Sequence, residues 1–124
     1  MDAVDQALSR LKRKYPGSLL QRRPDGTALI TIPEFRLSPH WNKPKTSLMF
    51  ILPVGYPLAP PDTFWTDADL RLAHGGFPSN TDLNTRYGGP EPRLWFSFHP
   101  ATWSPSQDDA LTFVQLIRQR LTSP

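Results

Sequence analysis

Residues 95–105 read Trp-Phe-Ser-Phe-His-Pro-Ala-Thr-Trp-Ser-Pro, and they join a long polar loop to the clearest helical pattern of the chain. In an extended segment, side chains two positions apart point to the same side. We therefore expect Ser97 and His99 to project together, while Phe96 and Phe98 face the core. A hydroxyl beside an imidazole is the minimum requirement for an activated oxygen nucleophile. The same spacing also occurs between surface residues without a catalytic role, and a third group that orients the imidazole would distinguish the two cases.

The pattern after this stretch predicts a helix over residues 106–121. Pro105 precedes it, Ser106 is expected to cap it, and Asp109 stands three positions later, as in a capping box. The apolar residues of this segment recur at helical spacing, and the stripe that they form predicts burial against the core. These residues are Ala110, Phe113, Val114, Ile117 and Leu121.

The segment before the stretch, residues 67–94, is rich in Gly, Pro and Asn. We expect no regular element there beyond a turn at residues 69–72. A loop of this length inside a small domain is usually either functional or poorly ordered. Because it leads directly to Ser97, it would form a wall or lid beside that residue.

Residues 53–66 contain four prolines, which exclude a helix and a central strand for most of the segment. They predict a rigid extended arm that ends in a short strand at residues 63–66. Aromatic side chains bury large areas, so Tyr56 and Trp65 are expected to pack against the rest of the protein.

The first half of the chain predicts one helix followed by strands. Residues 2–14 carry an apolar stripe at helical spacing, and Pro16-Gly17 end the pattern. Strands are expected over residues 18–22, 27–32 and 47–52, with a hairpin turn at 24–26 and a short continuation at 34–37. This order indicates an α+β domain with an antiparallel meander sheet backed by helices.

A basic cluster lies in the second half of the first helix: Arg10, Lys12, Arg13 and Lys14. Positive charges near a helix C-terminus oppose the macrodipole favourably, so a solvated helix end explains the cluster. The alternative is a docking surface in which Arg10, Arg13 and Lys14 contact an acidic partner.

The composition is that of one globular domain, spanning residues 1–124, with net charge +3. No cysteine is present, which excludes disulfides, thiolate metal sites and cysteine nucleophiles for this sequence. The three histidines lie far apart, and neither a metal nor another cofactor is expected. The longest apolar run, residues 48–53, is too short to span a membrane, and the pattern of the first residues is not that of a signal peptide. The expected location is the cytoplasm.

Nucleic-acid binding is an alternative from another class of function. Four Trp and several Arg could stack on and pair with single strands. The net charge is low for that role, and neither an RRM nor an OB pattern is present. We therefore expect no nucleic-acid partner.

The arm and the final helix carry a family resemblance. Residues 56–61, Tyr-Pro-Leu-Ala-Pro-Pro, resemble the YPxxPP motif of ubiquitin-conjugating enzymes, and residues 103–105 resemble that family's WSP segment before its crossover helix. The opening helix and the meander follow in the same order, so the resemblance covers nearly the whole chain. The aromatic pair at 64–65 and the Gly-rich loop resemble the divergent bacterial branch. The resemblance implies a UBC-like fold of N-terminal helix, antiparallel meander sheet, long loop and C-terminal crossover helix, without the family's last two helices.

Members of this family carry an active-site cysteine before the WSP segment, and this sequence has none. Aligned without a gap from Trp103, that position falls on Trp95, whereas a two-residue deletion places it on Ser97. The resemblance then implies a carrier that accepts a ubiquitin-like protein from an activating enzyme, as an oxyester on Ser97, and passes it to a protein target. His99 would be the general base. Asn80, or backbone N–H groups of the loop, would stabilise the oxyanion.

The family's HPN motif is not recognisable, although His74 and Asn80 lie in the corresponding loop with an expanded spacing. Two alternatives to the carrier follow from the missing cysteine. One is a non-catalytic UBC-like module that binds a ubiquitin-like protein or an activating enzyme. The other is a thioester-forming enzyme whose cysteine has been replaced by another residue in this sequence.

Overall fold

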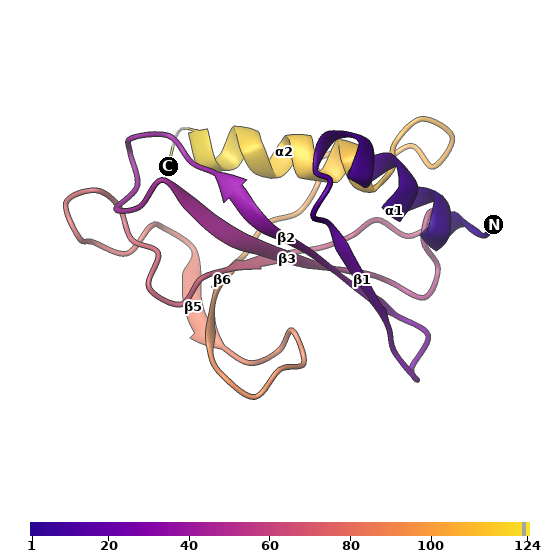
Figure 1. The fold of residues 1–124 in the computed structure, drawn as a ribbon, viewed down its shortest axis with the longest axis horizontal. Helices are drawn as coiled ribbons and strands as arrows, with labels where there is room; N and C mark the ends of the chain where they lie inside the picture. Colours follow the sequence, from indigo (N-terminus) through magenta and orange to yellow (C-terminus); the bar gives the residue numbers. More distant parts are fainter. Residues whose placement is uncertain (123) are drawn as a thin grey trace.

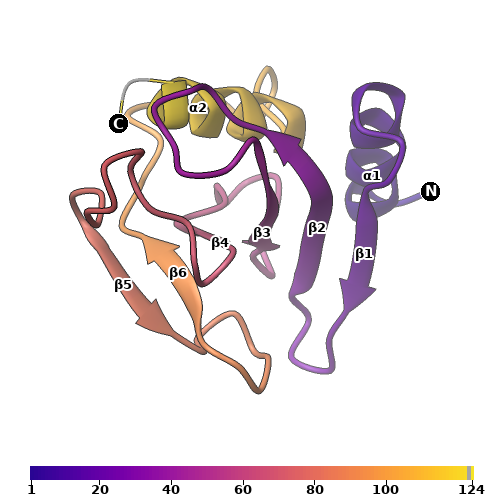
Figure 2. The same ribbon diagram turned by 60° about the vertical axis from the view of Figure 1, so that its left-hand side comes forward.

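A six-stranded antiparallel sheet with two helices forms the fold in the computed structural model, which describes residues 1–122 and 124 (Figure 1). The sheet order is β1-β2-β3-β4-β6-β5, so that β1 and β5 are the two edges (Figure 2). The predicted α+β class is confirmed. The elements are α1 (Ala3–Lys14), β1 (Leu19–Arg22), β2 (Ala28–Arg36), β3 (Lys45–Leu52), β4 (Phe64–Thr66), β5 (Thr81–Asn84), β6 (Arg93–Phe96) and α2 (Ala110–Thr122).

The prediction that residues 67–94 hold no regular strand is wrong. Strand β5 lies within this segment and pairs with β6 along its whole length, from Thr81 opposite Phe96 to Asn84 opposite Arg93. Its sequence is mostly polar, because an edge strand obtains its backbone hydrogen bonds from one neighbour and buries little side-chain surface. Leu83 of β5 is accordingly 42% exposed.

Strand β2 is longer than the predicted segment, because it continues through Pro33 to Arg36. The pairing with β3 becomes irregular between Ile32 and Phe35. Proline cannot donate a hydrogen bond to a neighbouring strand, and a bulge at this point accommodates it. The predicted short continuation at residues 34–37 is therefore part of the same strand.

The core lies between one face of the sheet and the two helices (Figure 1). Alternate residues of the strands point into it, and the aromatic side chains among them pack in pairs. Phe64 of β4 stacks on Phe96 of β6 with ring centroids 4.6 Å apart, and Phe50 of β3 meets Phe113 of α2 edge-on at 5.2 Å. Phe96, directly before Ser97, is thereby fixed to the sheet, and Phe98, directly after it, packs against Phe113 of α2 with ring centroids 6.0 Å apart.

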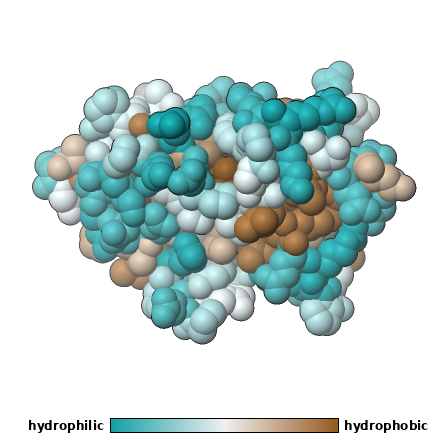
Figure 3. Space-filling model, in the orientation of Figure 1, coloured by the Kyte–Doolittle hydropathy of each residue, from teal (hydrophilic) through white to brown (hydrophobic). Residues whose placement is uncertain are grey.

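The other face of the sheet is not covered by the helices (Figure 1). Trp65 is nevertheless only 4% exposed there, because its indole donates a hydrogen bond to Asn84 (2.9 Å) and its ring packs against Tyr87 at 6.1 Å. At the β1 edge Leu19 remains 59% exposed, and Figure 3 shows apolar surface around this strand. Among residues 1–122, neither helix is long and apolar enough to cross a bilayer.

The proline-rich arm is held at two points. The indole of Trp103 donates a hydrogen bond to the carbonyl of Pro57 (2.8 Å), and the hydroxyl of Tyr56 accepts one from the backbone N–H of Ala110 (2.9 Å). Burial raises the pKa of Tyr56. The WSP segment and the start of α2 therefore fix the arm that precedes β4. Together with the burial of Trp65 described above, this confirms the expectation that Tyr56 and Trp65 are packing residues.

Helix α1 begins after Asp2, whose carboxylate accepts a hydrogen bond from the N–H of Asp5 (2.8 Å). Arg22 at the end of β1 binds the same carboxylate at 2.9 Å and also Asp5 at 3.0 Å. The hydrogen bond from Arg22 is the main reason why the pKa of Asp2 falls to about 2. This contact ties the N-terminal end of the helix to the far end of the strand that follows it.

Helix α2 begins at Ala110, four positions after the predicted cap at Ser106. Asp109 takes the capping role, because its carboxylate accepts a hydrogen bond from the N–H of Thr112 (3.0 Å). Asp108 accepts one from the N–H of Ser104 (2.7 Å) and thereby closes a tight turn over residues 104–108. The prediction of a Ser106 cap is wrong because this turn removes residues 106–108 from the helix.

Replacing Asp109 with alanine is expected to lower the free energy of unfolding by about 1–2 kcal/mol, the usual cost of a lost N-cap. The ion pair between Asp109 and Arg10 (2.9 Å) adds little, since the Arg10 side chain is 62% exposed. Chemical unfolding measures the effect. Ser106→Ala is the matched control and should change stability by less than about 0.5 kcal/mol. The reverse ranking would mean that the helix begins at Ser106.

Candidate functional site

Ser97 follows the last residue of β6 and is held on both sides through the backbone. Its N–H donates a hydrogen bond to the carbonyl of Asn80 (2.9 Å), and the carbonyl of the next residue, Phe98, accepts one from Thr63 (2.8 Å). Phe96 is fully buried, whereas Ser97 is exposed. The burial therefore alternates as the sequence predicts, and the hydroxyl of Ser97 is open to solvent.

His99 is also exposed, and its Nδ1 pairs with the carboxylate of Asp62. Asp62 directly follows the last proline of the arm, so the arm places an acidic group beside the imidazole. The two side chains are 66% and 59% exposed, and solvent screens their attraction. Sequence reasoning missed Asp62, although its position at the end of the YPxxPP-like motif was the available signal.

The arrangement leaves one ring nitrogen of His99 for proton transfer. When Asp62 accepts the hydrogen bond from Nδ1–H, the lone pair lies on Nε2, which can then take a proton. Within residues 1–122 no hydrogen bond joins this ring to Ser97. Both residues are exposed, and among the described residues the imidazole is bonded to Asp62 and not to Ser97. Catalytic hydrogen bonds are often long in a protein without its substrate.

Asn80 flanks Ser97 on the β5 side. Its φ of +59° lies in the left-handed region, which Asn adopts more readily than most residues. The side chain is exposed at the start of β5. His74 lies elsewhere, in a turn where its Nδ1 accepts a hydrogen bond from the N–H of Gly76 (3.3 Å). The structure thus brings Asn80, and not His74, to the backbone of Ser97.

Trp95 is the position reached by the alignment without a gap. It is half-buried, and the guanidinium of Arg86 lies over its ring at 4.6 Å. An indole offers no nucleophile for acyl transfer. Of the two positions considered, Ser97 is therefore the one that carries a hydroxyl and faces solvent.

The three basic residues considered for partner binding are neighbours on α1, since positions three and four apart on a helix lie on the same face. Arg10 is ion-paired with Asp109 near the start of α2. Arg13 is exposed, and Lys14 lines a cavity between α1, β2 and α2. The role of Arg10, Arg13 and Lys14 in partner binding stays a prediction. Within the described part of the chain, no group of three or more His, Asp or Glu side chains is arranged to hold a metal ion.

Comparison with known proteins places the chain in a protein family. The family model described as prokaryotic E2 family E matches residues 18–123. This range runs from the residue before β1 to the end of α2, and it includes Asp62, Asn80, Ser97 and His99. No curated protein matches the chain, and no solved structure does.

Proposed function

The chain belongs to prokaryotic E2 family E, and from this premise we propose that it carries a ubiquitin-like protein as an oxyester on Ser97. A member of an E2 family interacts in general with ubiquitin-like proteins and with the enzymes that activate them. The observation that carries the proposal is the position of Ser97, an exposed hydroxyl on a segment that is fixed on both sides and contains no cysteine.

The reaction is an acyl transfer in two steps. The activating enzyme uses ATP and presents the C-terminus of the ubiquitin-like protein as a thioester. The hydroxyl oxygen of Ser97 attacks the carbonyl carbon, Nε2 of His99 takes the hydroxyl proton, and the thiolate leaves and takes up a proton. The amino group of a protein target then attacks the oxyester, forms an amide and returns the hydroxyl to Ser97.

Serine needs more help than cysteine, because its hydroxyl is almost fully protonated at neutral pH. The pair of Asp62 and His99 supplies a base with a fixed tautomer, which is the arrangement that activates serine in other acyl-transfer sites. An amide side chain near the attacked carbonyl stabilises the oxyanion, and Asn80 is the amide held next to Ser97 by the backbone. Asp62 would be the third group, which orients the imidazole, and the sequence pattern alone does not identify it.

Replacing Asp62 with asparagine is expected to slow formation of the oxyester by at least about tenfold, because the amide can fix His99 in the wrong tautomer. Single-turnover loading followed by intact-mass spectrometry measures the rate. Asp82, an exposed residue of β5, offers a matched control as Asp82→Asn. If Asp62 acts only in folding, the rate of oxyester formation per folded molecule will be the same in Asp62→Asn as in the unaltered protein. That result contradicts the proposal.

The second candidate is a module of the same family that binds a ubiquitin-like protein or an activating enzyme without a covalent step. One observation favours it: within residues 1–122 the imidazole of His99 is bonded to Asp62 and not to Ser97. Intact-mass spectrometry after incubation with the activating enzyme, ATP and the ubiquitin-like protein separates the two candidates. A carrier gains the mass of the partner minus water, and a binding module gains none.

A further inference from the structure

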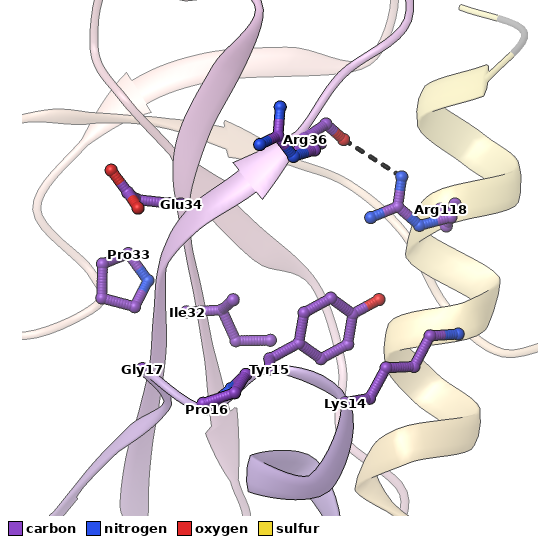
Figure 4. A pocket seen from close by; sticks show the side chains of 9 residues that line it. All are labelled: Lys14, Tyr15, Pro16, Gly17, Ile32, Pro33, Glu34, Arg36 and Arg118. Atoms are coloured by element: carbon purple, nitrogen blue, oxygen red, sulfur yellow. Dashed lines mark hydrogen bonds between the residues drawn. The ribbon is translucent and has the colours of Figure 1, made fainter.

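The cavity with a volume of about 480 Å³ between α1, β2 and α2 takes no part in the proposed transfer (Figure 4). It lies where α1 ends and the chain turns towards β1. Its volume is in the range of pockets that hold organic ligands or short peptide segments. The charged residues of the lining are Lys14, Glu34, Arg36 and Arg118, and its apolar surface comes from Tyr15, Pro16, Ile32 and Pro33.

Cationic groups gather on the α2 side of this cavity. Lys14 and the hydroxyl of Tyr15 point towards α2, and Arg118 reaches from α2 towards β2 (Figure 4). The guanidinium of Arg118 is held in place, since it donates a hydrogen bond to the carbonyl of Arg36 (3.0 Å) and lies over the ring of Phe35 at 4.1 Å. A guanidinium fixed in this way can bind a carboxylate at a low cost in side-chain entropy.

The one acidic residue of the lining, Glu34, pairs mainly with Lys45 and only partly offsets the charge of Arg36. Glu34 is bonded to Lys45 at 2.6 Å, and this contact lowers the pKa of Glu34 and keeps it charged. Lys14, Arg36 and Arg118 have no acidic partner among the ion pairs of the described residues. The cavity therefore carries positive charge above an apolar floor of Tyr15 and Ile32.

The backbone at this cavity has an open strand edge. Strand β1 pairs with β2 only over Ala28–Thr31, whereas β2 continues to Arg36. Within the described residues no strand lies beside residues 32–36 on the side away from β3. Pro33 has no N–H to donate there, and the carbonyl of Arg36 already accepts a hydrogen bond from Arg118. An extended segment in this groove is therefore held mainly by its side chains, and alternate side chains give specificity.

We propose that this groove binds an extended acidic peptide segment of a partner protein. An apolar side chain of the segment rests on Tyr15 and Ile32. The carboxylates two positions before and after it point to the same side of an extended segment and meet Lys14 and Arg118. The proposal does not depend on the chemistry of Ser97, which is outside the lining of the groove.

The test follows the ¹⁵N-labelled full chain by NMR while a capped pentapeptide, acetyl-Glu-Ser-Val-Ser-Glu-amide, is added. In its extended form both Glu side chains and the Val side chain lie on one face. Saturable shifts are expected for the amides of Tyr15, Ile32 and Arg118, and the affinity should fall as salt is added. The neutral peptide acetyl-Gln-Ser-Val-Ser-Gln-amide should bind at least about tenfold more weakly. Equal binding of the two peptides, or shifts confined to other parts of the protein, would overturn the proposal.

Charge reversal locates the contact. Lys14→Glu is expected to weaken binding of the acidic pentapeptide by about tenfold. Lys12→Glu, two positions earlier on the same helix and outside the lining, is the matched control and should leave the affinity within about twofold. Thermal unfolding checks that both variants fold. Equal losses of affinity in the two variants would indicate attraction to the overall charge of the protein. Binding of free glutamate as tight as that of the peptide would indicate a simple anion site. Either result contradicts the proposal.

Discussion

Ser97→Ala is expected to abolish the covalent adduct that forms when the protein is incubated with its activating enzyme, ATP and a ubiquitin-like protein. The adduct of the unaltered protein should resist thiol reductants and should be cleaved by hydroxide, because an oxyester exchanges with thiols far more slowly than a thioester does. Gel electrophoresis under reducing conditions, with and without alkaline treatment, measures both properties. The expected loss in Ser97→Ala is complete, since the remaining methyl group offers no nucleophile.

Two further variants sharpen this experiment. Ser97→Cys should form an adduct faster and make it sensitive to thiols, because a thiol is a better nucleophile than a hydroxyl. Ser106→Ala, an exposed serine in the turn before α2, is the matched control and should load normally. An adduct that persists unchanged in Ser97→Ala would place the acceptor on another residue. If no adduct forms and the partner binds Ser97→Ala with unaltered affinity, the protein is a binding module.

Phe96→Ala is expected to have the largest effect on stability, a loss of about 3–5 kcal/mol in the free energy of unfolding. Phe96 is fully buried, stacks on Phe64 at 4.6 Å and meets Trp41 edge-on at 6.2 Å. Removing the ring leaves a cavity directly behind Ser97. The loss is a large part of the total stability of a small domain, which is about 5–15 kcal/mol. Denaturant unfolding measures it, and loading of a ubiquitin-like protein on Ser97 should fall with the folded fraction.

Phe77→Ala is the control for this substitution, because Phe77 is 55% exposed. Its ring lies under the guanidinium of Arg71 at 3.8 Å, an exposed contact that contributes less than about 1 kcal/mol. If both substitutions destabilise the protein equally, the stacked aromatic pair behind Ser97 is not the centre of the core.

The sequence predicts those elements whose pattern is strong and local. Helix α1 and strands β1, β2 and β3 follow from helical spacing, from alternation and from the turn at residues 24–26, and each is found within a few residues of its predicted place. Strand β5 could not be predicted in this way, because its polar edge sequence becomes a strand only through pairing with β6. The start of α2 differs from the predicted one because Asp108 accepts a hydrogen bond from the N–H of Ser104 in a turn, and Asp109 then caps the helix at the N–H of Thr112.

The sequence likewise predicts the local features of the candidate site but not its long-range contacts. The exposure of Ser97 beside a buried Phe96 follows from alternation within one segment, and the sequence predicts it. The contact of His99 with Asp62 joins residues 37 positions apart, and no local pattern announces it. The basic groove is assembled from α1, β2 and α2, so its charges come together only in the folded chain. The roles of Ser97, His99 and Asn80 stay predictions.

The central claim is that one hydroxyl, that of Ser97, receives the acyl group, and mapping the modified residue tests it most directly. The protein is loaded, digested at a pH low enough to preserve esters, and sequenced by tandem mass spectrometry. We predict that the C-terminal remnant of the ubiquitin-like protein lies on Ser97, and that the peptide loses it on treatment with hydroxide. A remnant on a lysine amine, or an unmodified Ser97 in protein whose intact mass shows loading, would contradict the account.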